Sequence, residues 1–125
     1  MNLNDAKILI CDDSILARKQ LKNAISEDGQ PTILEARDGQ EAVDIYKKEN
    51  PNLVLIDLVM PNKDGNTAIC EIMEYDSSAT IVVVSSVGTQ SSLKRAIESG
   101  ARDFIQKPLV ENQVSNILRN YFGEK

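Results

Sequence analysis

The sequence predicts an α/β fold in which helices cover both faces of a single parallel sheet. Five short segments rich in apolar residues alternate with five segments whose apolar residues recur at helical spacing. Three of the short segments, residues 8–11, 53–56 and 81–84, are apolar throughout. Strands of this kind are typically buried on both faces, as in parallel sheets whose strands are joined by helices. The alternation and the continuous apolar runs therefore favour five strand–helix units.

Two of these units lie in the first part of the chain. Strands are expected over residues 7–11 and 32–36, and helices over residues 14–27 and from Asp38-Gly39 onwards. Gly29 follows the first helix and Pro51 follows the second, and both residue types commonly end helices. The side chains expected to face the core are Ala17, Leu21, Ala24 and Ile25 from the first helix and Ala42, Val43 and Tyr46 from the second.

Three more units follow. Strands are expected over residues 52–57, 80–85 and 102–106, and helices over residues 66–75, 89–99 and 109–122. A loop of turn-forming residues, 61–65, separates the third strand from its helix, and Gly100 ends the fourth helix. The side chains expected to face the core are Ile69, Ile72 and Met73, then Leu93, Ala96 and Ile97, and finally Val114, Ile117, Leu118 and Tyr121.

The order of the strands follows from the handedness of their connections. Right-handed crossovers put such a chain into a doubly wound sheet. We expect the flavodoxin-like (βα)5 arrangement, with five parallel strands in the order 2-1-3-4-5. Its switch point, where ligands bind outside the carboxyl ends of the strands, lies between the first and third strands.

Composition limits the classes of function. The 125 residues, 42% of them hydrophobic, suit a single domain over residues 1–125 with no output domain. A net charge of −5 argues against direct nucleic-acid binding. No apolar stretch is long enough to cross a membrane, no signal sequence begins the chain, and two isolated cysteines form no disulfide framework. We therefore expect a cytoplasmic protein without a membrane anchor.

Polar residues of three chemical types end the apolar runs. Asp12 and Asp13 follow the first strand, Asp57 follows the third, Ser85 ends the fourth and Lys107 follows the fifth. Parallel strands would bring these residues to one rim of the sheet. Clustered carboxylates raise one another's pKa unless a cation neutralises them, and oxygen ligands suit Mg²⁺. Helix capping would explain one of these acids, but not three acids together with a lysine.

This set of groups suits phosphoryl transfer. A carboxylate can act as the nucleophile, while Mg²⁺, Lys107 and Ser85 can neutralise the oxygens of the transferred group. The Lys107-Pro108 bond can be cis at modest cost, and a cis bond would fix the direction of Lys107. The chain contains no histidine, so a hydrolase with a Ser-His-acid triad is not supported.

The motifs "ILICDDS", "LVLIDLVMPNKDG", "IVVVSS" and "ARDFIQKP" occur in this order across the whole chain. In these motifs the chain resembles the response regulator receiver domains of the CheY-like family, particularly single-domain receivers of the chemotaxis type. The resemblance implies Asp57 as the phosphoacceptor and Lys107 as the lysine that pairs with the phosphate. It implies Mg²⁺ binding by Asp12, Asp13, Asp57 and the backbone carbonyl of Val59.

The resemblance also implies two switch residues. Ser85 is implied as the switch hydroxyl, and Phe104 as the aromatic residue that turns inward after phosphorylation.

The same resemblance implies a phosphorylation switch of a two-component phosphorelay. A sensor histidine kinase would donate the phosphoryl group, and a downstream signalling or flagellar-switch protein would receive the signal. Such a protein is no enzyme beyond catalysing its own phosphorylation and dephosphorylation, and it is a monomer or a weak dimer. Val59 and Val87 stand where chemotaxis-type receivers often carry polar residues beside the path of the attacking water. We expect slow self-dephosphorylation from these two aliphatic side chains.

Two other functions remain open at this point. A Mg²⁺-dependent phosphatase of the haloacid dehalogenase type would use the same aspartyl-phosphate chemistry, but it usually carries an acid two residues after the nucleophile, where this chain has Val59. A flavodoxin-type protein would bind FMN in a loop rich in Ser, Thr and Gly after the first strand. Here that loop begins with Asp12 and Asp13, which repel phosphate.

Overall fold

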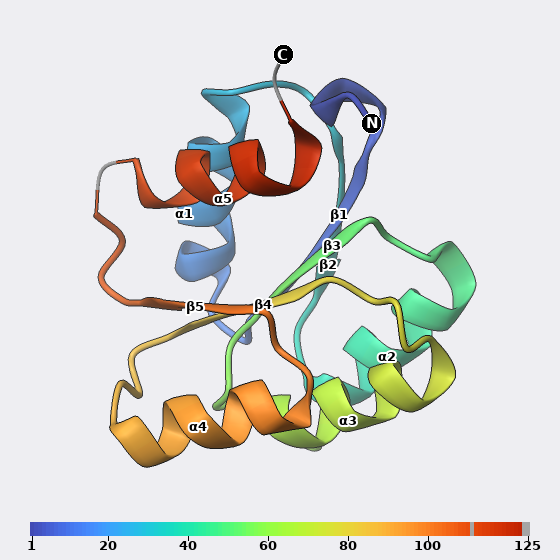
Figure 1. Ribbon diagram of the computed structural model, residues 1–125, viewed down its shortest axis with the longest axis vertical. Coiled ribbons are helices and arrows are strands. Elements are labelled where there is room, and N and C mark those ends of the chain that lie inside the picture. Colours follow the sequence, from blue (N-terminus) through green and yellow to red (C-terminus); the bar gives the residue numbers. More distant parts are fainter. Residues whose placement is uncertain (111, 124–125) are drawn as a thin grey trace.

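A computed structural model of the protein describes residues 1–110 and 112–123. It confirms the predicted architecture, a five-stranded parallel sheet in the order β2-β1-β3-β4-β5. Figure 1 shows the sheet between two helical layers, with α1 and α5 on one face and α2, α3 and α4 on the other. No helix among the described residues is long and apolar enough to cross a bilayer.

The elements lie close to their predicted positions. The strands are β1 (Lys7–Cys11), β2 (Thr32–Ala36), β3 (Leu53–Ile56), β4 (Ile81–Ser85) and β5 (Asp103–Gln106). The helices are α1 (Ile15–Ser26), α2 (Gly39–Glu49), α3 (Gly65–Tyr75), α4 (Gln90–Ser99) and α5 (Gln113–Phe122), preceded by a short 3-10 helix, Leu3–Asp5. Ser14, Asp38, Asp64 and Thr89 cap the first four α-helices by accepting hydrogen bonds from the first turn.

The start of α5 is the clearest error in the predicted boundaries. We expected this helix from residue 109, but it begins at Gln113. Asn112 has a φ of 73°, which a helix cannot contain, and the Val110 N–H donates to Oε1 of Gln113 instead of joining a helical ladder. The first part of the predicted helix is therefore a loop, of which residue 111 lies outside the described residues. The Lys107–Pro108 peptide bond in front of this loop is cis.

Each face of the sheet has its own hydrophobic core, because successive strand residues point to opposite sides. Leu9, Val54 and Val83 pack towards α2, α3 and α4, while Ile8, Leu55 and Val84 pack towards α1 and α5. The predicted core residues of α2 are all buried, as are most of those of α3 and α5. Because both faces of the sheet are packed, the carboxyl rim of the strands is where the predicted site residues can reach solvent.

Two helices differ from the predicted inward stripe. In α4 only Ala96 is buried, whereas Leu93 is 40% exposed and Ile97 is 45% exposed. The helix is the outermost of its layer, next to α3, and no other described helix lies on its far side (Figure 1). In α1, Leu21 and Ile25 are buried as expected and Ala17 and Ala24 only partly, but Arg18 is buried as well.

Candidate functional site

The strand register brings the predicted site residues to one rim. Cys11 of β1 pairs with Ile56 of β3, so Asp12 and Asp57 leave the sheet side by side. The Asp57 N–H donates to the carbonyl oxygen of Cys11 at 2.9 Å, which fixes this alignment. On the other side of β3, Ser85 ends β4 and Lys107 follows β5, with the Lys107 N–H donating to the carbonyl of Ser85.

Asp12 is buried and all of its polar atoms have partners. Its N–H donates to the Ala36 carbonyl at 3.0 Å, and its own carbonyl accepts from Nη1 of Arg18 at 2.7 Å. In the carboxylate, Oδ1 accepts from the Ser14 N–H at 2.9 Å and Oδ2 accepts from Nζ of Lys107 at 2.6 Å. This carboxylate therefore has a single defined position.

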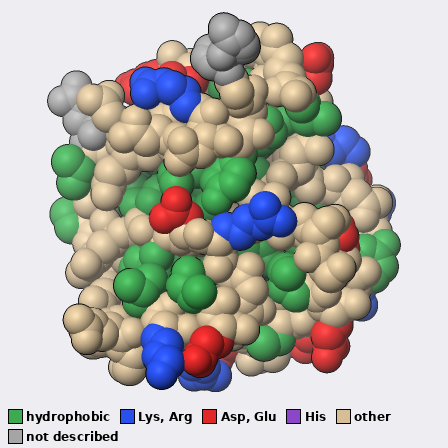
Figure 2. All heavy atoms as spheres, in the orientation of Figure 1, with side chains coloured by type: hydrophobic (Ala, Val, Ile, Leu, Met, Phe, Trp, Pro, Cys, Tyr) green, Lys and Arg blue, Asp and Glu red, His purple; other side chains and the backbone are tan. Residues whose placement is uncertain are grey.

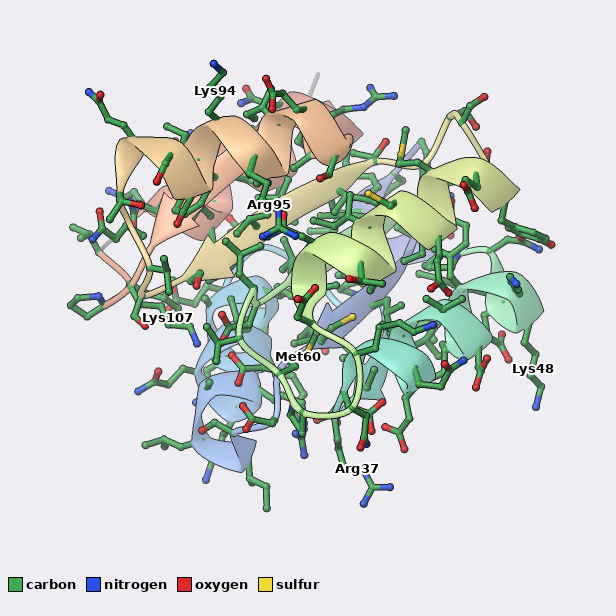
Figure 3. All side chains as sticks on the ribbon, turned by 90° about the horizontal axis from the view of Figure 1, so that it is seen from below. Arg37, Lys48, Met60, Lys94, Arg95 and Lys107 are labelled. Carbon is green, nitrogen blue, oxygen red and sulfur yellow. The ribbon has the colours of Figure 1, made fainter. Side chains whose placement is uncertain are left out.

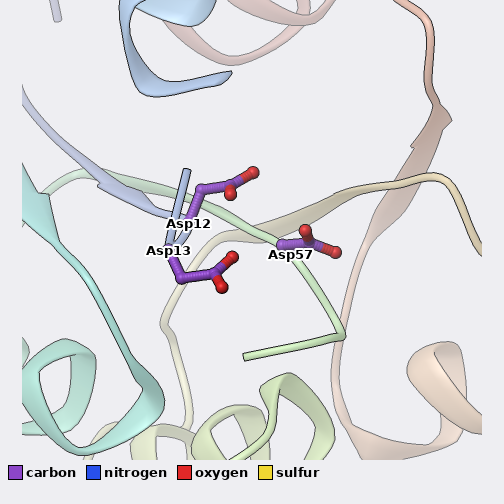
Figure 4. A group of neighbouring side chains, drawn as sticks. All are labelled: Asp12, Asp13 and Asp57. Carbon is purple, nitrogen blue, oxygen red and sulfur yellow. The ribbon is translucent and has the colours of Figure 1, made fainter. Parts of the chain in front are cut away.

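The three acids form one cluster. Asp12, Asp13 and Asp57 each place a carboxylate oxygen within 4.8 Å of the other two. Figure 4 shows them gathered where β1 and β3 end. Asp57 is mostly buried, and its Oδ1 accepts from the Val59 N–H at 3.3 Å, whereas Asp13 is exposed. The cluster thus opens to solvent on the side of Asp13.

Lys107 balances part of this negative charge. Its Nζ lies 2.6 Å from Asp12 and 3.3 Å from Asp57, and in Figure 3 its side chain points towards this rim. Partial burial by itself lowers the pKa of the lysine. The hydrogen bond to Asp12 and the charges of Asp57 and Asp12 outweigh burial, so the pKa is raised overall. The lysine is therefore charged at neutral pH and available to pair with an anion.

Two further predicted residues, Ser85 and Phe104, form no side-chain hydrogen bond with the acids among the described residues. The Ser85 hydroxyl is fully buried and accepts a hydrogen bond from the Val87 N–H at 3.3 Å. Within the described residues its hydroxyl forms no hydrogen bond with Asp57. Phe104 is half-buried and packs against the core between the sheet and helices α2, α3 and α4. It lies on β5, where it pairs with Val83 of β4. Val59 and Val87 flank the rim, and the Val59 side chain is 62% exposed.

The loop between β3 and α3 is anchored at several points. The Gly39 N–H donates to the carbonyl of Lys63 at 3.0 Å, and the Asn62 side chain donates to Asp38 at 2.7 Å. At Gly65 the backbone passes so close to the carbonyl of Asp57 that a Cβ atom would collide with it. These contacts hold the segment that carries Asp57 and Val59.

Sequence reasoning missed Arg18. Its Nε donates to Oε1 of Glu35 at 2.8 Å, and its Nη1 reaches the Asp12 backbone. The signal was present in the helical spacing, because position 18 shares an inward face with Leu21 and Ile25.

The chemistry of this rim suits a hard divalent cation and an anion beside it. Three carboxylates converge and one ammonium group contacts two of them, so negative charge is left over. Carboxylate and backbone oxygens are the ligands that Mg²⁺ prefers, usually together with phosphate oxygens and waters. The donor set therefore fits the predicted metal, and Asp57 places a carboxylate within the same cluster.

Comparison with known proteins agrees with this chemistry. A family model described as the response regulator receiver domain matches residues 8–119. The chain is 41% identical over 108 residues to the chemotaxis protein CheY of Bacillus subtilis (strain 168), which covers 86% of this chain and 90% of that protein. It is also 41% identical over 112 residues to the chemotaxis protein CheY of Thermotoga maritima, covering 90% and 93%.

A solved structure shares both fold and sequence. A chain in the crystal structure of the CheX–CheY–BeF3–Mg complex from Borrelia burgdorferi superimposes with a TM-score of 0.88 at 36% identity, covering 95% of this chain and 90% of that one. The likeness spans all five strand–helix units. The protein therefore belongs to the response regulator receiver domains and signals by phosphorylation in a two-component system.

Proposed function

We propose that Asp57 is the residue that accepts the phosphoryl group, from a phosphohistidine of a sensor histidine kinase, and that Asp12, Asp13 and the Val59 carbonyl hold Mg²⁺ with it. The observation that carries this proposal is the cluster of three carboxylates around Lys107 at the carboxyl rim of the sheet. We further propose that the protein acts in the cytoplasm.

In the transfer step, a carboxylate oxygen of Asp57 attacks phosphorus. The new O–P bond forms as the P–N bond of the phosphohistidine breaks, and the electron pair stays on the imidazole, which takes up a proton. Mg²⁺, when bound, supplies positive charge to the phosphoryl oxygens. Lys107, already 3.3 Å from Asp57, can move its ammonium from the carboxylate to the phosphoryl group. Ser85 would then donate its hydroxyl to a phosphoryl oxygen after releasing the Val87 N–H.

We propose that the protein performs this reaction on itself and does not turn over phosphomonoesters. An aspartyl-phosphate phosphatase of the haloacid dehalogenase type usually carries an acid two residues after its nucleophile. Here that residue is Val59, an exposed aliphatic side chain. It cannot protonate a leaving group or activate water, so each phosphorylation would persist long enough to be read by a partner.

Two exposed apolar surfaces support protein partners. Ile15 and Leu16, in the first turn of α1, come two and three residues after Asp13 and are exposed. A kinase that brings its phosphohistidine to Asp57 must cover this edge. The second surface includes Leu93 and Ile97 of α4, and Figure 2 shows hydrophobic side chains on the face between α4 and α5. We propose this second surface for a downstream partner such as a CheX-like or flagellar-switch protein.

Beryllofluoride binding tests the assignment of Asp57, because BeF3⁻ on a carboxylate imitates an aspartyl-phosphate. Wild-type protein and Asp57→Asn are titrated with beryllofluoride in the presence of Mg²⁺, and binding is followed by ¹⁹F and ¹⁵N NMR. Asp44→Asn, on the exposed side of α2, is the matched control. We expect saturable binding by the wild type and the control, with shifts at Ser85 and Phe104, and none by Asp57→Asn.

Two results would overturn the proposal. One is a bound ¹⁹F signal in Asp57→Asn equal to that of the wild type, which would put the acceptor elsewhere. The other is a wild type that binds no beryllofluoride at any Mg²⁺ concentration. Rapid turnover of a small phosphomonoester would contradict the proposed lack of phosphatase activity.

A further inference from the structure

Arg18 is the buried guanidinium beside the acidic cluster. Only 9% of the residue is exposed, although arginine is rarely buried unless its charge is paired. It lies on the inner face of α1, one turn before Leu21. Its Nε donates to Oε1 of Glu35 on β2, and its Nη1 donates to the backbone carbonyl of Asp12. One side chain thus joins α1, the end of β1 and the edge strand β2.

The contact with Asp12 fixes the peptide that carries the proposed ligand. The Asp12 N–H is held by Ala36 of β2, and its carbonyl is held by Arg18 at 2.7 Å. With both ends of the residue bonded, the direction of its carboxylate is set before any cation arrives. Hydrogen bonds from a charged donor to a buried carbonyl are stronger than neutral ones.

Glu35 holds the guanidinium in turn. Its carboxylate accepts from Nε of Arg18 at 2.8 Å and from Lys22 at 3.0 Å. Those partners, the Lys22 hydrogen bond first, lower the pKa of Glu35 against a smaller opposing effect of burial. The acid is therefore ionised at neutral pH and anchors Arg18 to the edge strand.

We infer that Arg18 is a positioning residue for cation binding, which acts through the Asp12 backbone and is anchored by Glu35. This inference rests on the proposed function, because it concerns the same carboxylate cluster. Groups that orient metal ligands from behind typically contribute about 10- to 100-fold to metal affinity.

Electrostatics alone predicts the opposite sign. A guanidinium near a cation site repels the cation, so removing its charge would tighten Mg²⁺ binding. Positioning predicts weaker binding, because the Asp12 peptide loses a partner and can reorient. The two explanations are therefore separated by the direction of the change in affinity.

The test measures Mg²⁺ affinity directly, from ¹⁵N NMR titration of the amides of Asp13 and Val59. Arg18→Met removes the guanidinium and keeps the aliphatic stem. Arg18→Lys keeps the charge but not both hydrogen bonds. Lys22→Met is the matched control, since it removes an equal charge and one Glu35 contact without touching Asp12. Circular dichroism and a urea midpoint establish that each variant is folded.

We expect Arg18→Met to raise the Kd for Mg²⁺ by about tenfold, with Arg18→Lys intermediate and Lys22→Met unchanged or slightly tighter. At saturating Mg²⁺, all three should reach the wild-type plateau of beryllofluoride binding, because Asp57 is intact. If Arg18→Met does not fold, Arg18→Lys replaces it and should weaken Mg²⁺ binding several-fold, whereas electrostatics alone predicts no change because the charge is kept.

Unchanged or tighter Mg²⁺ binding by a folded Arg18→Met, or by Arg18→Lys in its place, would overturn the inference while leaving the proposed function intact. A similar loss in Lys22→Met would also overturn it, since that variant keeps the contact with Asp12. Failure of the proposed function itself would appear in the wild type, as an absence of beryllofluoride binding.

Discussion

At the scale of single residues, some groups of the site are fixed by hydrogen bonds or ion pairs, whereas others project into solvent. Asp12 has partners at every polar atom, and Lys107 lies between two carboxylates. Val59 differs, because its backbone N–H bonds to Asp57 while its side chain projects into solvent. The fixed groups, Asp12 and Lys107, suit the phosphoryl chemistry that receivers share. The exposed Val59 side chain is where the rate of phosphate release from this protein can differ from that of other receivers.

Val59→Asn should speed the release of phosphate from the phosphorylated protein a few-fold. An exposed amide at this position can hydrogen-bond the attacking water, which valine cannot do. The measurement is the decay of ³²P-labelled protein in Mg²⁺. Val110→Asn is the control, because Val110 is similarly exposed at 63% but lies in the loop before α5. Equal decay rates for wild type and Val59→Asn would contradict the idea.

At the scale of elements, the helices differ in how much of their apolar face is buried in the core. In α2 the core takes Ala42, Val43 and Tyr46, and the helix N-terminus also anchors the β3–α3 loop. In α4 the core takes only Ala96. The sequence predicted equal inward stripes for both, because apolar spacing records which side chains share a face but not what covers that face.

Polar substitutions on the outer side of α4 should leave stability almost unchanged. Leu93→Gln and Ile97→Gln should each change the free energy of unfolding by at most about 0.5 kcal/mol, because both residues are already exposed. Ile69→Ala, at a fully buried position of α3, should cost about 2–5 kcal/mol. Urea unfolding measures all three. A multi-kcal/mol loss of unfolding free energy in Leu93→Gln would contradict this, and would indicate that Leu93 is buried as the sequence predicted.

Asp38→Ala should destabilise the protein by about 1 kcal/mol at pH 7, the usual contribution of a helix N-cap. The Glu41 N–H first, and then the Asn62 side chain, lower the pKa of Asp38 from its ordinary value of 3.8. An acid with a lowered pKa stabilises the fold above its unfolded pKa, and this contribution is lost as the pH falls through the folded value. The difference between wild type and variant should therefore shrink below pH 3.8.

Urea unfolding at neutral and acidic pH checks this prediction. Asp44→Ala, an exposed position on the same helix, serves as the control and should cost no more than about 0.5 kcal/mol at either pH. A penalty for Asp38→Ala that is as large in acid as at pH 7 would show that the ionised carboxylate is not what stabilises the helix.

At the scale of the whole molecule, much of the fold was predictable because its signals are local. Continuous apolar runs mark the strands, and Gly or Pro residues mark most helix ends. The rim cluster followed from topology, since parallel strands bring their carboxyl ends together. The two failures have different causes. The burial of Arg18 depends on Glu35, which lies on another element, whereas the late start of α5 depends on the positive φ of Asn112, which apolar spacing does not record.

Mg²⁺ should stabilise the whole domain, because the carboxylate cluster exists only in the folded chain. At a free Mg²⁺ concentration ten times the Kd, the free energy of unfolding should rise by about 1.4 kcal/mol. Urea unfolding with Mg²⁺ and with EDTA measures the difference, and Asp13→Asn should show a smaller one. An equal gain in Asp13→Asn would mean that the cation binds elsewhere.

The outward sides of α1 and α4 carry exposed apolar residues, Ile15 and Leu16 on one and Leu93 and Ile97 on the other, that belong to neither core. Since we expect polar substitutions at such exposed positions to leave stability almost unchanged, selection for folding should constrain them little. A duplicated gene could therefore acquire a new kinase or a new target through a few surface changes while its chemistry stayed the same. Re-engineering the signalling specificity of this chain should begin at those four positions.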